Sequence, residues 1–136
     1  METITSEETR YLIRDIAIDQ HLDLVMLFGS YAKGRAVKES DIDIGVLKKT
    51  GLSHDDEINL NHQFSELFKS NNVNVSIISS NNPLLMYNIL AFGKILYQKE
   101  DDLAYRLKLY AWKLLAESKS FRDHSFSLVR QKIISL

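Results

Sequence analysis

The sequence predicts a small α/β domain of the α+β type, in which helices flank a mixed sheet. Residues 24–28 form an unbroken apolar run, which is typical of a strand buried on both faces. A second apolar segment carries Asp41 and Asp43 in alternation with isoleucines, so the two carboxylates share one face of a strand. Helical apolar spacing recurs before, between and after these strands. Helices packed on a small sheet are the economical architecture for this order.

The first helix is expected from Thr5 and Glu8, which fit a capping box ahead of apolar residues at helical spacing. This helix should end near Gln20 and cover the sheet. A second helix is expected after the two strands, because Ser53 can cap it and acidic residues follow near its positive end. Its apolar residues continue to Phe68, just before a polar break.

Residues 73–78 predict a third strand, with valines on its core face and Asn74 on a face that starts polar. The next helix should begin at Pro83 and end at Gly93, because proline favours the first helical position and glycine the end. Residues 94–98 (Lys-Ile-Leu-Tyr-Gln) then predict a short strand.

From Asp101 the apolar spacing is helical, interrupted near residues 118–120 and followed by a second helical piece over residues 121–134. The first piece mixes tyrosines and a tryptophan with arginine and lysine, a composition typical of protein interfaces. A helix that simply packs its leucines on the domain is the plainer interpretation. We nevertheless expect these C-terminal helices to serve association with a partner or with a second copy of the chain.

Length and composition predict one domain over residues 1–136, with a core in residues 1–100 and a helical extension in residues 101–136. The chain has 136 residues, of which 45% are hydrophobic and 26% charged, enough for a single apolar core. Its 17 basic and 18 acidic residues nearly cancel, so direct nucleic-acid binding is not expected. The absence of cysteine excludes disulfides, thiol catalysis and zinc sites built on cysteine.

The first ten residues are polar and acidic, unlike the basic and then apolar start of a signal peptide. No apolar run approaches the roughly 20 residues that a membrane-spanning helix needs. The sequence therefore predicts a cytoplasmic protein without a membrane partner.

The segment between the first two strands suggests a phosphate site. Gly29 permits a tight turn after the first strand, and Ser30 sits where backbone amides would be free to bind an anion. Glycine and serine are common in turns of every kind, so this pair alone indicates little.

The two aspartates suggest a metal site beside the phosphate site. Asp41 and Asp43 offer hard oxygen ligands, and Mg²⁺ is usually held by a few carboxylates together with substrate phosphates. A phosphate cradle with an acidic metal site is the chemistry of phosphoryl or nucleotidyl transfer. The plainer alternative is that Asp41 belongs to a polar turn and Asp43 is an exposed strand residue.

The combination is more specific than its parts. Gly29 and Ser30, then ten residues, then Asp41-x-Asp43, resemble the signature of the polymerase β-like nucleotidyltransferase superfamily. More narrowly, GSYAKGRAVKESDIDIGVL is similar to the minimal nucleotidyltransferases (MNT), antitoxins encoded beside HEPN-domain partners in toxin–antitoxin pairs. The resemblance covers most of the chain up to about Glu100.

By this resemblance, Asp41 and Asp43 are catalytic and bind the Mg²⁺ cofactor, while Gly29 and Ser30 hold the phosphates of the substrate ATP. The implied function is transfer of AMP to a tyrosine of a HEPN ribonuclease toxin encoded nearby, which silences the toxin. Arg35 is a further nucleotide-binding candidate, although it can equally be a solvated side chain. Such proteins would be cytoplasmic.

Two further residues bear on the site. Ser40 is a nucleotide-binding candidate that would support the aspartate pair, although capping a turn is as plausible a role for it. Asn74 stands where the family has a third carboxylate, and it marks a third site position. An asparagine is neutral and cannot accept the proton of an attacking hydroxyl.

Three interpretations of Asn74 stay open: slow transfer, a carboxylate supplied from elsewhere, or a degenerate enzyme that binds without chemistry. The alternative function is accordingly an MNT-like antitoxin that neutralises its partner by binding alone. A further alternative is a small-molecule nucleotidyltransferase of the aminoglycoside type.

Overall fold

The computed structural model of the chain describes residues 6–36 and 40–118. In these residues the elements follow in the predicted order, which confirms the α+β class: α1 (Glu7–Asp19), β1 (Leu24–Phe28), β2 (Ile42–Leu47), α2 (His54–Phe68), β3 (Val73–Ile77), α3 (Pro83–Phe92), β4 (Lys94–Gln98) and α4 (Leu103–Glu117). The helical piece expected over residues 121–134 lies outside the described residues.

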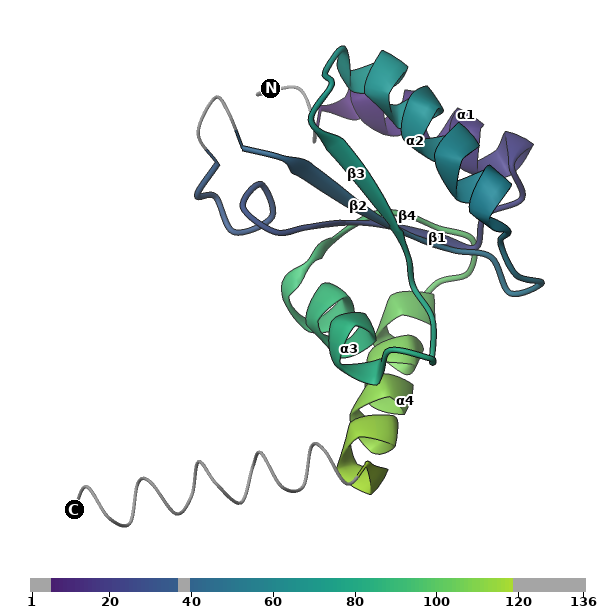
Figure 1. Ribbon diagram of the computed structural model, residues 1–136, viewed down its shortest axis with the longest axis vertical. Coiled ribbons are helices and arrows are strands. Elements are labelled where there is room, and N and C mark those ends of the chain that lie inside the picture. The colour runs from purple at the N-terminus through teal and green to yellow at the C-terminus, as the bar shows by residue number, and fades with distance from the viewer. Residues whose placement is uncertain (1–5, 37–39, 119–136) are drawn as a thin grey trace.

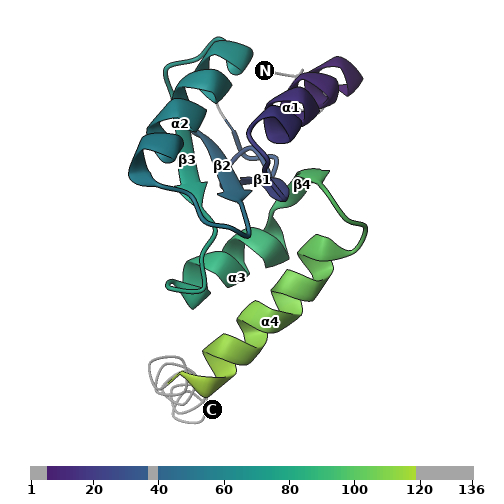
Figure 2. The same cartoon turned by 90° about the vertical axis from the view of Figure 1, so that its right-hand side faces the viewer.

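The sheet is mixed, with strand order β3-β2-β1-β4. β1 pairs antiparallel with both β2 and β4, and β2 pairs parallel with β3 through the crossover helix α2. Helices α1 and α2 cover one face of the sheet, and α3 and α4 lie on the other, as the two views in Figures 1 and 2 show. The domain is therefore a three-layer arrangement of helix, sheet and helix.

The register brings four chain segments to one end of the sheet. Phe28 at the end of β1 pairs with Asp43 near the start of β2, and Leu27 pairs with Lys94 at the start of β4. Asp43 also pairs with Asn74 near the start of β3. The loop after β1 therefore emerges beside the first residues of the other three strands, and this end of the sheet carries the candidate site.

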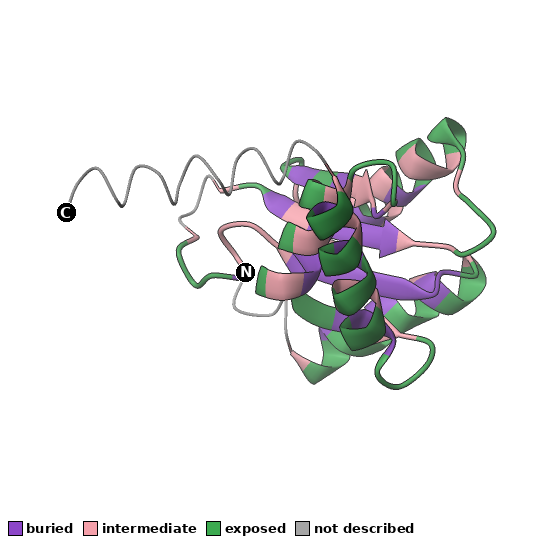
Figure 3. Cartoon of the chain, turned by 90° about the horizontal axis from the view of Figure 1, so that it is seen from below, coloured by how far each residue is buried: buried purple, intermediate pink, exposed green. Residues whose placement is uncertain are grey.

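Each face of the sheet has its own apolar core. Ile42 and Ile44 are fully buried under α1 and α2, beside the fully buried Phe64 of α2, as their alternation with the aspartates predicts. On the other face, Met26 packs with Ile89 of α3 and with residues of α4. Figure 3 shows the buried residues gathered in the sheet and the exposed ones on the outer surfaces of the helices. Burial of each large apolar side chain contributes roughly 1.5–3 kcal/mol.

The helix N-termini follow capping chemistry, with one correction. The N-cap of α1 is Ser6, whose side chain accepts a hydrogen bond from the Thr9 amide at 3.2 Å, and not Thr5 as predicted. Both residues carry the required hydroxyl, but the helix begins one residue later than the pattern suggested. At α2 the prediction is confirmed: Ser53 and Asp56 form a reciprocal capping box. Hydrogen bonds from Ser53 lower the pKa of Asp56.

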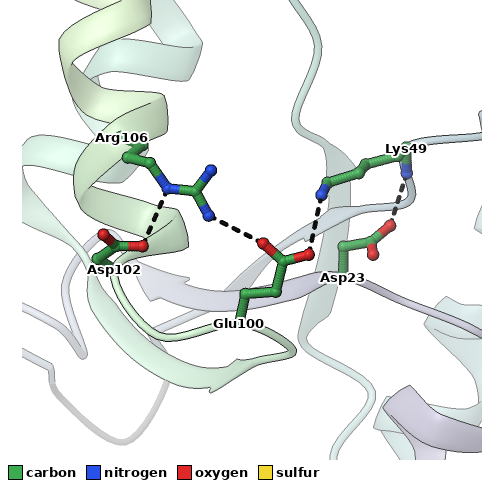
Figure 4. A network of polar contacts seen from close by, with 5 residues as sticks. All are labelled: Asp23, Lys49, Glu100, Asp102 and Arg106. Carbon is green, nitrogen blue, oxygen red and sulfur yellow. Dashed lines mark hydrogen bonds and ion pairs between the residues drawn. The ribbon is translucent and has the colours of Figure 1, made fainter.

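A polar network joins the start of α4 to the far end of the sheet (Figure 4). Glu100 accepts hydrogen bonds from Lys49 Nζ at 3.4 Å and from Arg106 Nη2 at 2.9 Å, and Arg106 Nε donates to Asp102 at 2.9 Å. The hydrogen bond from Arg106 is the main reason that the pKa of Glu100 is lowered. The Asp23 carboxylate accepts a hydrogen bond from the backbone amide of Lys49 at 2.7 Å. The ion pairs of this network are about half exposed, so they contribute little stability.

Helix α4 buries a narrow stripe and leaves aromatic side chains outside. Ala104 and Ala111 are buried in the core shared with α3, whereas Tyr105, Tyr110 and Trp112 are each about half exposed. The role of α4 in association with a partner or with a second copy of the chain stays a prediction. Within residues 6–36 and 40–118, every helix is too short or too polar to cross a bilayer.

Candidate functional site

The loop after β1 is a series of turns that leaves backbone donors free. Gly29 has φ +74°, in the left-handed region that favours glycine. Three hydrogen bonds close the turns: the Lys33 amide donates to Gly29 O at 3.2 Å, the Gly34 amide to Tyr31 O at 3.5 Å, and the Arg35 amide to Ser30 O at 2.9 Å. Among the described residues, the amides of residues 30–32 donate to no backbone carbonyl. Successive free amides in a turn can form an anion-binding concavity, and the phosphate site at Gly29 and Ser30 stays a prediction.

The carboxylate of Asp43 lies directly against the Gly29 backbone. A Cβ placed on Gly29 would overlap Asp43 Oδ2, so the absence of a side chain at Gly29 is what allows this approach. The contact follows from the antiparallel pairing of Phe28 with Asp43. The predicted phosphate end and the predicted metal end of the segment are thus adjacent in space.

Asp43 has two polar neighbours of opposite effect. The Asn74 side chain donates a hydrogen bond to the Asp43 carboxylate, which favours its charged form, whereas partial burial and the nearby Asp41 charge disfavour that form. Burial is the largest of these effects, and the net result is a raised pKa for Asp43. Asp41, one residue before β2, is exposed. The charge of the Asp43 carboxylate is therefore poorly compensated by the protein groups around it.

Asp43→Asn is expected to raise the free energy of unfolding at neutral pH, because it removes this poorly compensated charge and keeps an acceptor for Asn74. The folded pKa of Asp43 lies above its ordinary value of 3.8, so the chain loses stability as pH rises through the folded pKa and Asp43 ionises. The variant avoids this loss. Urea unfolding at about pH 7 and about pH 3 should show the gain only at the higher pH. A variant less stable than wild type at neutral pH would contradict the assignment.

The donor set fits a hard cation. Within residues 6–36 and 40–118, neither Asp41 nor Asp43 forms an ion pair with a basic side chain. No group of three or more His, Cys, Asp or Glu residues in that part of the chain could hold a metal alone. Two carboxylates with the Asn74 amide nearby suit Mg²⁺, which commonly takes its remaining ligands from water and substrate phosphates.

No contact of Ser40 or Arg35, the other two predicted nucleotide-binding residues, with the Asp43 carboxylate is established in the described part of the chain. Ser40 immediately precedes Asp41 and is partly exposed. Arg35 lies at the end of the turns with an exposed side chain, and in the described residues it forms no ion pair with either aspartate. The structure therefore brings together Gly29, Asp43 and Asn74, with Ser30 next to them in the loop.

Comparison with known families decides the relationship. The family described as polymerase β nucleotidyltransferase matches residues 12–102, well over half of the 136 residues. The chain belongs to this family. The matched region contains every predicted site residue of this nucleotidyltransferase, from Gly29 to Asn74.

Solved structures share the fold of this nucleotidyltransferase. A chain of a toxin–antitoxin crystal structure with AMP-PNP superposes with a TM-score of 0.73 at 24% identity, covering 89% of this chain and 98% of that one. The complex of a tri-AMPylated Shewanella oneidensis HEPN toxin with MNT antitoxin gives 0.68 at 21%, covering 91% and 98%. The MntA–HepT toxin–antitoxin gives 0.68 at 20%, covering 92% and 99%. No curated protein matches the sequence significantly.

The nucleotidyltransferase also has a cavity that the sequence did not reveal. It has a volume of about 240 Å³ and is lined by Phe28, Gly29, Lys33, Asn88 and Phe92. Asn88 and Phe92 come from α3 and were not predicted as site residues. Their spacing of four residues on one predicted helix was visible in the sequence, but only the packing of α3 under the sheet places them beside Gly29.

Proposed function

We propose that this nucleotidyltransferase is an MNT-type antitoxin that transfers AMP from ATP to a tyrosine of a HEPN ribonuclease toxin and so neutralises it. The observation that carries the proposal is the contact between the Gly29 backbone and the Asp43 carboxylate. It puts free loop amides and an acidic metal-binding pair within reach of one triphosphate. The fold shared with chains of toxin–antitoxin complexes supports the choice of partner.

In the proposed reaction the tyrosine oxygen attacks the α-phosphorus of ATP. A new oxygen–phosphorus bond forms, the bond to the β-phosphate oxygen breaks, diphosphate leaves and the hydroxyl proton passes to solvent. The amides of residues 30–32 and the Ser30 hydroxyl bind phosphate oxygens, and Asp41 and Asp43 hold Mg²⁺. Bound there, Mg²⁺ would neutralise the charge that develops on the phosphates. Arg35 and Ser40 would add contacts at the rim of the site.

Asn74 sets the expected speed of the reaction. Its amide holds Asp43 in place but cannot accept the proton of the tyrosine hydroxyl. A positioned base contributes typically about 10²- to 10⁴-fold to a rate. Transfer by this chain should therefore be slow.

Asn74→Asp is expected to raise the rate of AMP transfer, by about tenfold or more, because the new carboxylate faces the same end of the sheet as Asp43. Single-turnover labelling of the toxin with labelled ATP measures it. Asn74→Ala is the matched comparison, since it removes the amide without adding a base. An unchanged or slower rate in Asn74→Asp would count against this role for the position.

Asn74 also favours a second candidate function, neutralisation of the toxin by binding alone. With Asn74 in place of a third carboxylate, the protein can neutralise its partner by binding alone. The aromatic side chains exposed on α4 support a docking role for that helix, either toward the toxin or toward a second copy of the chain. Both functions place the protein in the cytoplasm, where ATP and a ribonuclease toxin would meet.

The experiment that separates the candidates mixes the protein with labelled ATP, Mg²⁺ and the toxin encoded by the neighbouring gene. Label on the toxin, with loss of its ribonuclease activity, is the expected result. Tight binding and inhibition without label would favour masking. Label only on small hydroxyl compounds would assign the protein to the aminoglycoside type of transferase, and the main proposal would be wrong.

A further inference from the structure

The cavity beside Gly29 opens on the same face of the sheet as Asp43. Phe28 pairs directly with Asp43, and paired residues of neighbouring strands point to the same face. Phe28 also packs against the core under α3, which places that face toward α3. Gly29 belongs both to the cavity wall and to the contact with Asp43. A ligand that fills the cavity therefore lies beside the loop that carries the free amides.

The size and lining of the cavity suit the base of a nucleotide. Its volume of about 240 Å³ is below the roughly 300–1,000 Å³ of pockets that hold whole drug-sized ligands. Its lining includes two aromatic residues, Phe28 and the more exposed Phe92, and one amide, Asn88, which has both donors and an acceptor. Aromatic rings stack on bases, and an asparagine amide can pair with the donor and acceptor edge of adenine. Lys33 adds a positive charge on the loop side.

The aromatic ring is available and supported from one side. Phe92, the last residue of α3, is 61% exposed although it is apolar. The ring of Tyr87 meets it edge-on, with centroids 6.4 Å apart and planes at 88°. Tyr87 in turn contacts Trp112 of α4, with centroids 5.7 Å apart. These contacts restrict the Phe92 ring, so the Phe92 side chain loses little additional freedom when a base stacks on it.

We propose that this cavity is the nucleoside subsite of the nucleotidyltransferase: Phe92 stacks on the adenine of ATP, Asn88 hydrogen-bonds to its edge, and the triphosphate runs past Gly29 to the loop amides and the aspartates. The assignment rests on the proposed function, since it assumes that the Gly29 loop binds a nucleoside triphosphate. It adds a source of base recognition, which the loop and the aspartates do not provide.

The test compares two probes by isothermal titration calorimetry in the presence of Mg²⁺: ATP, and inorganic tripolyphosphate, which lacks the nucleoside. Phe92→Ala should raise the Kd of ATP by about 5- to 150-fold, the effect of losing one stacked base, and leave the Kd of tripolyphosphate unchanged. Phe92→Trp should retain ATP affinity. Asn88→Leu should also weaken ATP alone. Leu84→Ala is the matched control, since Leu84 is an apolar residue of α3 with similar exposure, 55% against 61% for Phe92, and does not line the cavity.

The outcomes separate this inference from the function on which it rests. If wild type binds ATP and Phe92→Ala binds it equally well, the nucleoside lies elsewhere and only the subsite is overturned. That includes the case in which Phe92→Ala slows transfer to the toxin at unchanged ATP affinity, which would give the cavity to the acceptor tyrosine. If wild type binds neither ATP nor tripolyphosphate, the proposed function fails and the subsite with it.

Discussion

Replacing both Asp41 and Asp43 with asparagine is expected to abolish Mg²⁺-dependent transfer of AMP, by about 10³-fold or more. Losing the charge that holds the metal removes several kcal/mol of transition-state stabilisation, and each 1.36 kcal/mol is about tenfold in rate. Labelling of the toxin with labelled ATP over a Mg²⁺ titration measures the effect. The loss would not reflect unfolding, because the change at Asp43 is expected to stabilise the folded chain.

A matched control removes the same charge elsewhere. Asp15 and Asp19 are exposed carboxylates of α1, so changing both to asparagine alters the net charge equally without touching the site. This control should transfer AMP as wild type does. Labelling that persisted in the Asp41 and Asp43 double variant would remove the metal site from its assigned place.

Gly29→Ala is expected to inactivate the protein, while Gly34→Ala is not. Both glycines have positive φ, +74° and +69°, so an alanine at either position should lower the free energy of unfolding by about 1–2 kcal/mol. Only at Gly29 would the added Cβ collide with Asp43 Oδ2, since nothing lies within 4 Å of a Cβ at Gly34. We expect transfer to fall about 100-fold or more in Gly29→Ala alone.

Thermal unfolding and single-turnover labelling of the two variants, side by side, test this difference. Equal losses of stability with unequal losses of activity would assign the effect to the displaced carboxylate. If both variants kept full activity, the close approach of Gly29 to Asp43 would be irrelevant to the chemistry.

The strands and most of the helix starts could be predicted because local chemistry determines them. The apolar run of β1, the alternation in β2 and the cap at Ser53 each depend on residues only a few positions apart. The start of α1 was misplaced by one residue because Thr5 and Ser6 have equivalent capping chemistry. Local rules cannot choose between adjacent residues of the same kind.

The candidate site was predictable only in part, because some of its contacts join segments that are far apart in the sequence. The aspartate pair and the glycine turn lie in one segment, and Asn74 was identified from its place in a strand. The approach of Asp43 to Gly29 depends on the register of β1 with β2. The cavity depends on α3 passing under the sheet, which brings Asn88 and Phe92 to a loop more than 50 residues earlier in the chain.

The rings of Phe92, Tyr87 and Trp112 lie in sequence and connect the cavity to a fluorescent side chain. Trp112 is the single tryptophan of the chain, so tryptophan emission, excited at wavelengths that tyrosine does not absorb, comes from one known position. Its contact with Tyr87 joins that position to the ring that borders the cavity. A ligand that displaces Phe92 is therefore expected to change the colour and intensity of Trp112 emission, which would report binding without any attached dye.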